Sequence, residues 1–161
     1  TAAAWFSALS STDCPTAIVL SRQNLPQLCP DGKEALKGAY ILSGAEPEPE
    51  MIFIATGSEL GLAEEAAEEL RKEGKRVRVV SMPCRELFCL QSEEYREKVL
   101  PSSVTKRISV EALSSFGWGD IVGLKGKSLS MDSFGASAPA KELFQKFGFT
   151  VENLVHLAKS L

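Results

Sequence analysis

A single arginine, Arg22, is the residue in this sequence best placed to do chemistry, because it follows a short apolar run at residues 16–21. The run predicts a buried strand, and the loop after such a strand opens into the crevice where α/β sheets bind ligands. A guanidinium is a rigid fork of donors that matches phosphate or carboxylate, and Ser21 and Gln23 could add hydrogen bonds. Arg22 is therefore a candidate anion-binding residue, although from its position alone a structural ion pair or a capped turn is favoured.

A second candidate is the segment Thr56-Gly57-Ser58-Glu59, which joins an apolar run to a helical pattern. Backbone N–H groups and the dipole at the start of a helix favour an anion, so Thr56, Gly57 and Ser58 form a candidate anion site. The alternative is a capping box, in which Thr56 accepts from the N–H of Glu59 and Glu59 reaches back. The capping box is favoured, because the Glu59 carboxylate would itself repel an anion.

Histidine and cysteine usage excludes several kinds of site. His156 is the only histidine and has polar neighbours on its predicted helix, so a serine or cysteine hydrolase would lack its base. The four cysteines form no C-x-x-C pair and one histidine cannot complete a zinc set, so we predict no metal site. We interpret the cysteines as reduced thiols, which indicates a cytosol-like compartment.

Residues 51–81 predict the β–α–β unit that would position the second candidate. Residues 51–55 are continuously apolar, which is typical of a central parallel strand covered on both faces. A helix follows over roughly 59–73, with alanines and Leu70 on one face and most of its glutamates on the other. Residues 76–81 then predict the next strand.

The rest of the chain also alternates between the two periodicities. Further strands are expected at 39–42, 107–111 and 127–131, and further helices at 2–9, 83–90, 92–100, 140–147 and from 151, the last capped by Thr150. Turns are expected around residues 30–32, in the Glu-Pro loop at 46–50, and at 114–119, where Phe116 and Trp118 should pack in a core or at a domain interface. We predict an α/β fold: a three-layer, open, mainly parallel sheet with helices on both faces.

The first part of the chain is not expected to fold as a unit. One helix and one strand cannot form a core, so residues 1–37 are interpreted as the tail of another domain and a linker, and residues 38–161 as a domain. The 161 residues carry 18 Lys+Arg and 21 Asp+Glu, for a formal net charge of −3, without a basic cluster. No nucleic-acid partner is therefore expected. No apolar run approaches the roughly 18 residues of a membrane span, so no membrane partner is expected either.

Six segments together resemble the transketolase family. In order along nearly the whole chain they are SRQNLP at 21–26, IATGSE at 54–59, VRVVSMP at 77–83, SFGW at 115–118, FGASAP at 134–139 and FGFTVEN at 147–153. The chain departs from the family at Leu113, where a glycine is frequent, and at Ile121, where an aromatic residue is frequent. A left-handed turn at Leu113 would be strained.

The resemblance implies that the chain is a fragment of a transketolase, an enzyme that moves a two-carbon ketol unit between sugar phosphates. It further implies thiamine diphosphate and Mg²⁺ (or Ca²⁺) in the parent enzyme, a homodimer of the cytoplasm or a plastid. The chain would supply the carboxyl-terminal domain and the end of the pyrimidine-binding domain, whose arginine for the substrate phosphate matches Arg22.

The cofactor site of that family has no counterpart in this sequence. No segment resembles its metal-binding Gly-Asp-Gly motif, its channel histidines or its cofactor-activating glutamate. The fragment is therefore expected to bind no cofactor and to be inactive alone, with a structural or regulatory role. Two alternatives stay open: a stand-alone α/β module that binds a small anion at residues 56–59, or one subunit of a split transketolase.

Overall fold

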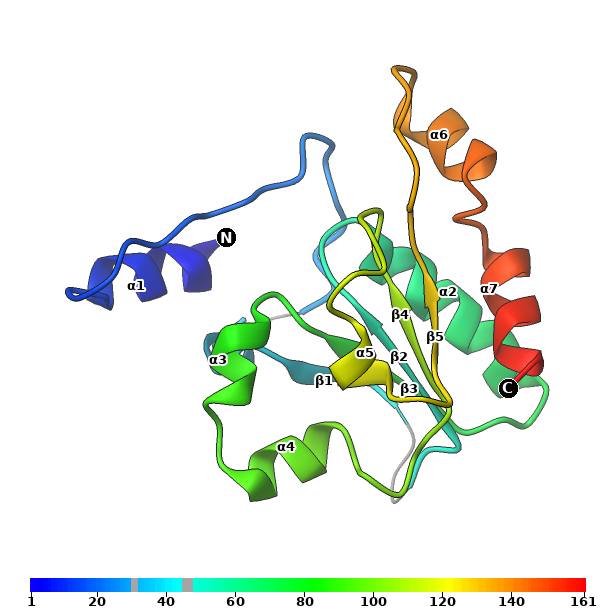
Figure 1. Ribbon diagram of the computed structural model, residues 1–161, viewed down its shortest axis with the longest axis horizontal. Helices are drawn as coiled ribbons and strands as arrows, with labels where there is room; N and C mark the ends of the chain where they lie inside the picture. Colours follow the sequence, from blue (N-terminus) through cyan, green and yellow to red (C-terminus); the bar gives the residue numbers. More distant parts are fainter. Residues whose placement is uncertain (30–31, 45–47) are drawn as a thin grey trace.

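The computed structural model describes residues 1–29, 32–44 and 48–161, and it confirms the three-layer α/β architecture (Figure 1). Five strands form one sheet in the order β1-β3-β2-β4-β5, namely β1 (Tyr40–Ser43), β2 (Met51–Ala55), β3 (Val77–Ser81), β4 (Arg107–Val110) and β5 (Lys127–Leu129). All pairs are parallel except that of β1, an edge strand antiparallel to β3. The turn expected around 30–32 and the loop at 46–50 lie partly outside the described residues.

The central strand β2 explains the continuous apolar run in its sequence. Phe53 pairs in register with Val79 of β3 on one side and with Ile108 of β4 on the other. Phe53 and its neighbour Ile54 are both fully buried, but they belong to the cores on opposite faces of the sheet. A strand that is paired along both edges and covered on both faces has no side left for polar residues.

One helical layer consists of α2 (Glu59–Lys72), α6 (Ala140–Lys146) and α7 (Val151–Lys159). α2 buries its small face, formed by Ala63, Ala66, Ala67 and Leu70, and it packs beside α7 (Figure 1). α7 begins where the sequence predicts, because the Thr150 hydroxyl accepts a hydrogen bond of 3.2 Å from the Asn153 N–H. Short, close-packed alanines let α2 approach the sheet along its length.

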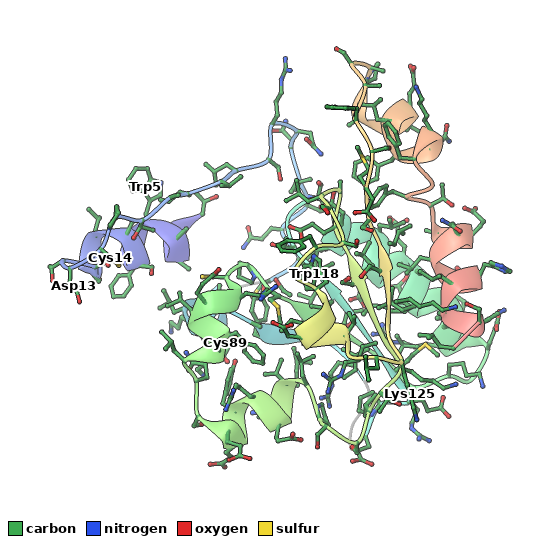
Figure 2. The ribbon with its side chains drawn as sticks, viewed as in Figure 1. Trp5, Asp13, Cys14, Cys89, Trp118 and Lys125 are labelled. Carbon is green, nitrogen blue, oxygen red and sulfur yellow. The ribbon has the colours of Figure 1, made fainter. Side chains whose placement is uncertain are left out.

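The opposite layer consists of three short helices, α3 (Arg85–Cys89), α4 (Glu93–Val99) and α5 (Gly119–Val122). Phe88, Val99 and Ile121 from these helices pack with Trp118 against the other face of β2. Figure 2 shows Trp118 within the body of the molecule. Trp5 instead lies on the amino-terminal arm, residues 1–28, which extends away from that body. The helices predicted at 83–90 and 92–100 are thus confirmed.

The arm at the amino terminus differs from the prediction. α1 (Ala2–Ser10) is a helix as expected, and the short 3₁₀ helix η1 (Lys33–Lys37) follows the arm. The strand predicted over 16–21 is wrong: residues 15–21 form neither helix nor strand, and Val19 is 94 % exposed. A strand requires a partner edge for its backbone groups, and no described strand lies against this segment, which runs apart from the sheet (Figure 1).

Candidate functional site

The segment that carries Arg22 lies between α1 and η1. Ser21, Arg22 and Gln23 are exposed. Within the described ranges, the Arg22 side chain makes no hydrogen bond or ion pair, so the structural ion pair considered above is not formed there. A guanidinium without a protein partner keeps its full set of donors for an external anion.

The turn after β2 is built differently from the expected capping box. A box with Thr56 as its first residue would require Gly57 to be helical, but Gly57 has a φ of +57° and α2 begins two residues later at Glu59. The residue that precedes the helix is Ser58, whose hydroxyl donates to Glu59 Oε2 at 3.1 Å and makes no cap bond to the backbone. The capping-box prediction is therefore wrong, and the left-handed glycine is the reason.

The Glu59 side chain lies beneath this turn and is only 6 % exposed. Burial raises the pKa of Glu59, and the nearby Glu111 carboxylate adds to the rise. Hydrogen bonds from its own N–H, from the Ser58 hydroxyl and from the Ala112 N–H act in the opposite direction. The acidic group of Glu59 thus occupies the end of α2 where an anion would otherwise bind.

The structure brings the two candidate segments together. A Cβ added to Gly57 would lie 3.5 Å from Ser21 Oγ and 3.9 Å from Glu59 Oε2. The residue before Arg22 therefore lies close to the outer side of the turn, while the buried Glu59 side chain lies on its inner side. Because β2 ends at Ala55, this meeting point is at the carboxyl edge of the sheet, the edge where open α/β sheets bind their ligands.

The loop at 114–119 lies at the same edge and is held by residues that the sequence did not single out. Asp132 accepts hydrogen bonds from the Ser115 N–H at 2.8 Å and from the Ser114 hydroxyl at 3.0 Å. These bonds lower the pKa of Asp132, and the bond from the Ser115 N–H has the largest effect. Arg85 donates to the Gly117 carbonyl. No local pattern could have revealed these pairs, because the partners are 17 to 32 residues apart.

The two aromatic residues of that loop have different environments in the structure. Trp118 is 6 % exposed and donates from Nε1 to Glu111 Oε2 at 2.9 Å, whereas Phe116 is 93 % exposed. The core prediction is therefore confirmed for Trp118 alone. Leu113 avoids the left-handed turn that a family glycine would allow, since every described residue with a positive φ is a glycine.

The histidine and the cysteines lie away from the two candidate segments in the sequence. His156 is exposed on α7, and Cys14, Cys29, Cys84 and Cys89 are free thiols. Across residues 1–29, 32–44 and 48–161, no three His, Cys, Asp or Glu side chains gather into a potential metal site. None of the helices in those ranges has the length and apolar character needed to cross a bilayer.

Comparisons with known proteins agree with this architecture. The family model of the transketolase-like TK C-terminal domain matches residues 38–150. The chain is 53 % identical to Transketolase 7 of Craterostigma plantagineum, over all of this chain and 25 % of that protein. It is also 53 % identical to Transketolase-1, chloroplastic, of Arabidopsis thaliana, over 99 % of this chain and 22 % of that protein. The chain spans about a quarter of the length of the curated relatives it matches.

Solved structures show the same similarity. The transketolase from Leishmania mexicana superposes with a TM-score of 0.88 at 46 % identity, over 98 % of this chain and 23 % of that chain. A split-gene transketolase, described as an inactive beta4 tetramer, superposes with a TM-score of 0.63 over 86 % of this chain and 47 % of that chain. Its identity of 21 % shows a common fold alone.

Proposed function

The chain belongs to the transketolase family, and from that premise we propose that it is the carboxyl-terminal part of a ketol transferase. The parent enzyme would move a two-carbon ketol unit between sugar phosphates with the help of thiamine diphosphate. The match to the carboxyl-terminal domain at 38–150 and the coverage of about a quarter of each relative support this proposal. Under this proposal, residues 1–37 are the end of the pyrimidine-binding domain and a linker. Residues 38–161 are then the carboxyl-terminal domain.

Arg22 is the residue of this chain that would contact substrate, by binding the phosphate group of the sugar. The observation that carries this role is an exposed arginine without a partner in the described part of the chain, next to Ser21, which lies close to the turn at the carboxyl edge of the sheet. Two parallel N–H donors of a guanidinium fit two phosphate oxygens. Ser21 and Gln23 are the supporting donors of this proposal.

The cofactor and its metal would lie in the other domains of the parent enzyme. A diphosphate-bound Mg²⁺ or Ca²⁺ needs several oxygen ligands, and the described residues offer no cluster of carboxylates or other metal-binding side chains. The residues of this chain therefore do not fit that group. We assign to the chain a structural or regulatory role within a homodimer, with no catalytic activity of its own, in the cytoplasm or a plastid.

The test of Arg22 uses the full-length enzyme that contains this chain. Arg22→Ala removes charge-assisted hydrogen bonds worth about 1.5–3 kcal/mol, which corresponds to roughly 10- to 100-fold in kcat/KM for a phosphorylated acceptor. An unphosphorylated acceptor should react as before. Arg96→Ala is the matched control, because Arg96 is likewise exposed and its side chain makes no hydrogen bond or ion pair within the described ranges. Equal losses with both acceptors would contradict the phosphate-binding role.

The isolated chain tests the remaining alternatives. Incubated with a ketose phosphate, an aldose phosphate, thiamine diphosphate and Mg²⁺, it should show no turnover above background. Restoration of activity by a companion chain would identify a split transketolase. In a phosphate titration, a shift of the Gly57 amide signal would instead support the anion module at Thr56, Gly57 and Ser58. We expect no shift, because the Glu59 carboxyl occupies that helix end.

A further inference from the structure

We propose that Ser21 is a positioning residue, which seats the Arg22 loop on the Gly57 turn so that the carboxyl-terminal domain determines where the guanidinium points. This inference rests on the proposed role of Arg22. It adds a function for the turn after β2: the turn is a seat for the substrate-binding loop of the preceding domain, rather than an anion site of its own.

The outer side of the contact is a loop with little else to hold it. Residues 15–26 make no hydrogen bond or ion pair with any part of the chain that the structure describes. Their placement therefore depends on packing, and Ser21 Oγ lies 3.5 Å from the position of a Cβ on Gly57, an ordinary van der Waals distance. A Cβ would still fit at this distance, but a longer side chain at position 57 would extend into the space of the Ser21 hydroxyl.

The inner side of the contact is firmly held. Glu59 lies under the turn, is only 6 % exposed, and accepts from the Ser58 hydroxyl at 3.1 Å. The neighbouring Glu111 accepts from Trp118 Nε1 at 2.9 Å, and Trp118 is packed in the core. The turn thus rests on a buried side chain at the carboxyl edge of the sheet, which makes it a fixed surface for Ser21.

The position of Ser21 matters for function because Ser21 is directly bonded to Arg22 in the chain. Adjacent Cα atoms are about 3.8 Å apart, so a displacement of Ser21 is passed to the next residue almost undiminished. A misplacement of about 1 Å can lower the rate of an enzyme by about 100-fold. A change at position 57 should therefore act on phosphorylated substrates as a partial loss of Arg22 would.

The experiment enlarges residue 57 in the full-length enzyme. Gly57→Asn extends a side chain toward Ser21, and asparagine tolerates a left-handed backbone. The matched control is Gly74→Asn, since Gly74 has a φ of +82° and an added Cβ there would meet nothing within 4 Å. Gly57→Asn should lower kcat/KM for a phosphorylated acceptor at least about 10-fold, mainly through KM, with the unphosphorylated acceptor unaffected. Gly74→Asn should leave both acceptors unchanged.

Two further variants complete the test. Gly57→Ala adds a Cβ at the ordinary distance of 3.5 Å and should keep the preference for phosphorylated acceptors within about two-fold. Ser21→Asn enlarges the same contact from the exposed arm, where it cannot disturb the core, and should reproduce Gly57→Asn. The inference is overturned if Gly57→Asn and Ser21→Asn leave that preference intact, or if they slow both acceptors equally. A preference that survives Arg22→Ala contradicts the proposed function itself, and the inference with it.

Discussion

Glu59 and Arg22 show at the scale of single residues how surroundings decide the use of a charge. Arg22 is exposed, with no partner in the described part of the chain, so its charge is available to a ligand. Glu59 is 6 % exposed and is surrounded by donors from its own turn and from Ala112. A buried carboxyl that already has hydrogen bonds serves the fold, and its removal should change stability rather than substrate binding.

The raised pKa of Glu59 predicts a specific dependence of stability on pH. Burial raises the pKa of Glu59 above its ordinary value of 4.5, so just above pH 4.5 the folded protein holds a proton that the unfolded chain has released. This contribution to the free energy of unfolding is complete below pH 4.5 and is lost as the pH rises through the folded-state pKa. Glu59→Gln keeps the shape of the side chain and one hydrogen-bond acceptor. Because glutamine does not ionise, this variant does not lose stability as the pH rises.

Urea denaturation at a series of pH values from 4.5 to 7 measures the effect. The free energy of unfolding of Glu59→Gln, relative to that of the unaltered chain, should increase above pH 4.5 and level off once the pH has passed the folded-state pKa of Glu59. Glu65→Gln, on the exposed face of α2, should show a constant difference. A constant difference for Glu59→Gln as well would show that the carboxyl ionises as easily in the folded protein as in the unfolded one.

At the scale of elements, sequence patterns succeeded wherever the partners of an element lie in this chain. The helix from 151 was predicted from Thr150 and an apolar face, and both are present, with Leu154 and Ala158 buried. The run at 16–21 has the composition of a buried strand, but Ile18 is half-buried and Val19 is exposed. An apolar pattern shows that a segment is suited to pack against a sheet or helix, but it does not show that such a partner lies beside it.

The cap of α7 carries a second prediction. Thr150→Ala removes the acceptor of the Asn153 N–H and should lower the free energy of unfolding by about 1 kcal/mol, as for other helix caps. The control is Thr105→Ala, since Thr105 is exposed and precedes no helix. Urea denaturation of both variants measures the difference. Equal values for the two threonines would mean that the Asn153 N–H is satisfied equally well by water.

At the scale of the whole molecule, local pattern predicted the layers but not the contacts between loops. The apolar run of β2 and the small face of α2 indicated a covered parallel sheet, because both features are periodic. The burial of Glu59, the approach of Ser21 to Gly57 and the bond from Ser115 to Asp132 depend on loops that are distant in sequence. The candidate residues were therefore found by type and position, whereas the geometry that relates them required the fold.

The same division predicts where the stability of the chain resides. No residue of α1 is buried and the arm through residue 28 is largely exposed, so it contributes little to either core, although α1 lies beside η1. Leu154, by contrast, is fully buried between α7 and the sheet. The free energy of unfolding should therefore depend on residues 38–161 far more than on the arm.

Deletion of residues 1–28 tests this directly, with Leu154→Ala as the comparison. The deletion should change the free energy of unfolding by no more than about 0.5 kcal/mol, as for other changes away from a core. Leu154→Ala should lower it by about 2–5 kcal/mol, because it removes buried methyl groups and leaves a cavity. Both are measured by urea denaturation, with equal slopes showing that the same unit unfolds. A deletion as costly as Leu154→Ala would mean that the arm, exposed though it is, belongs to the cooperative fold of the carboxyl-terminal domain.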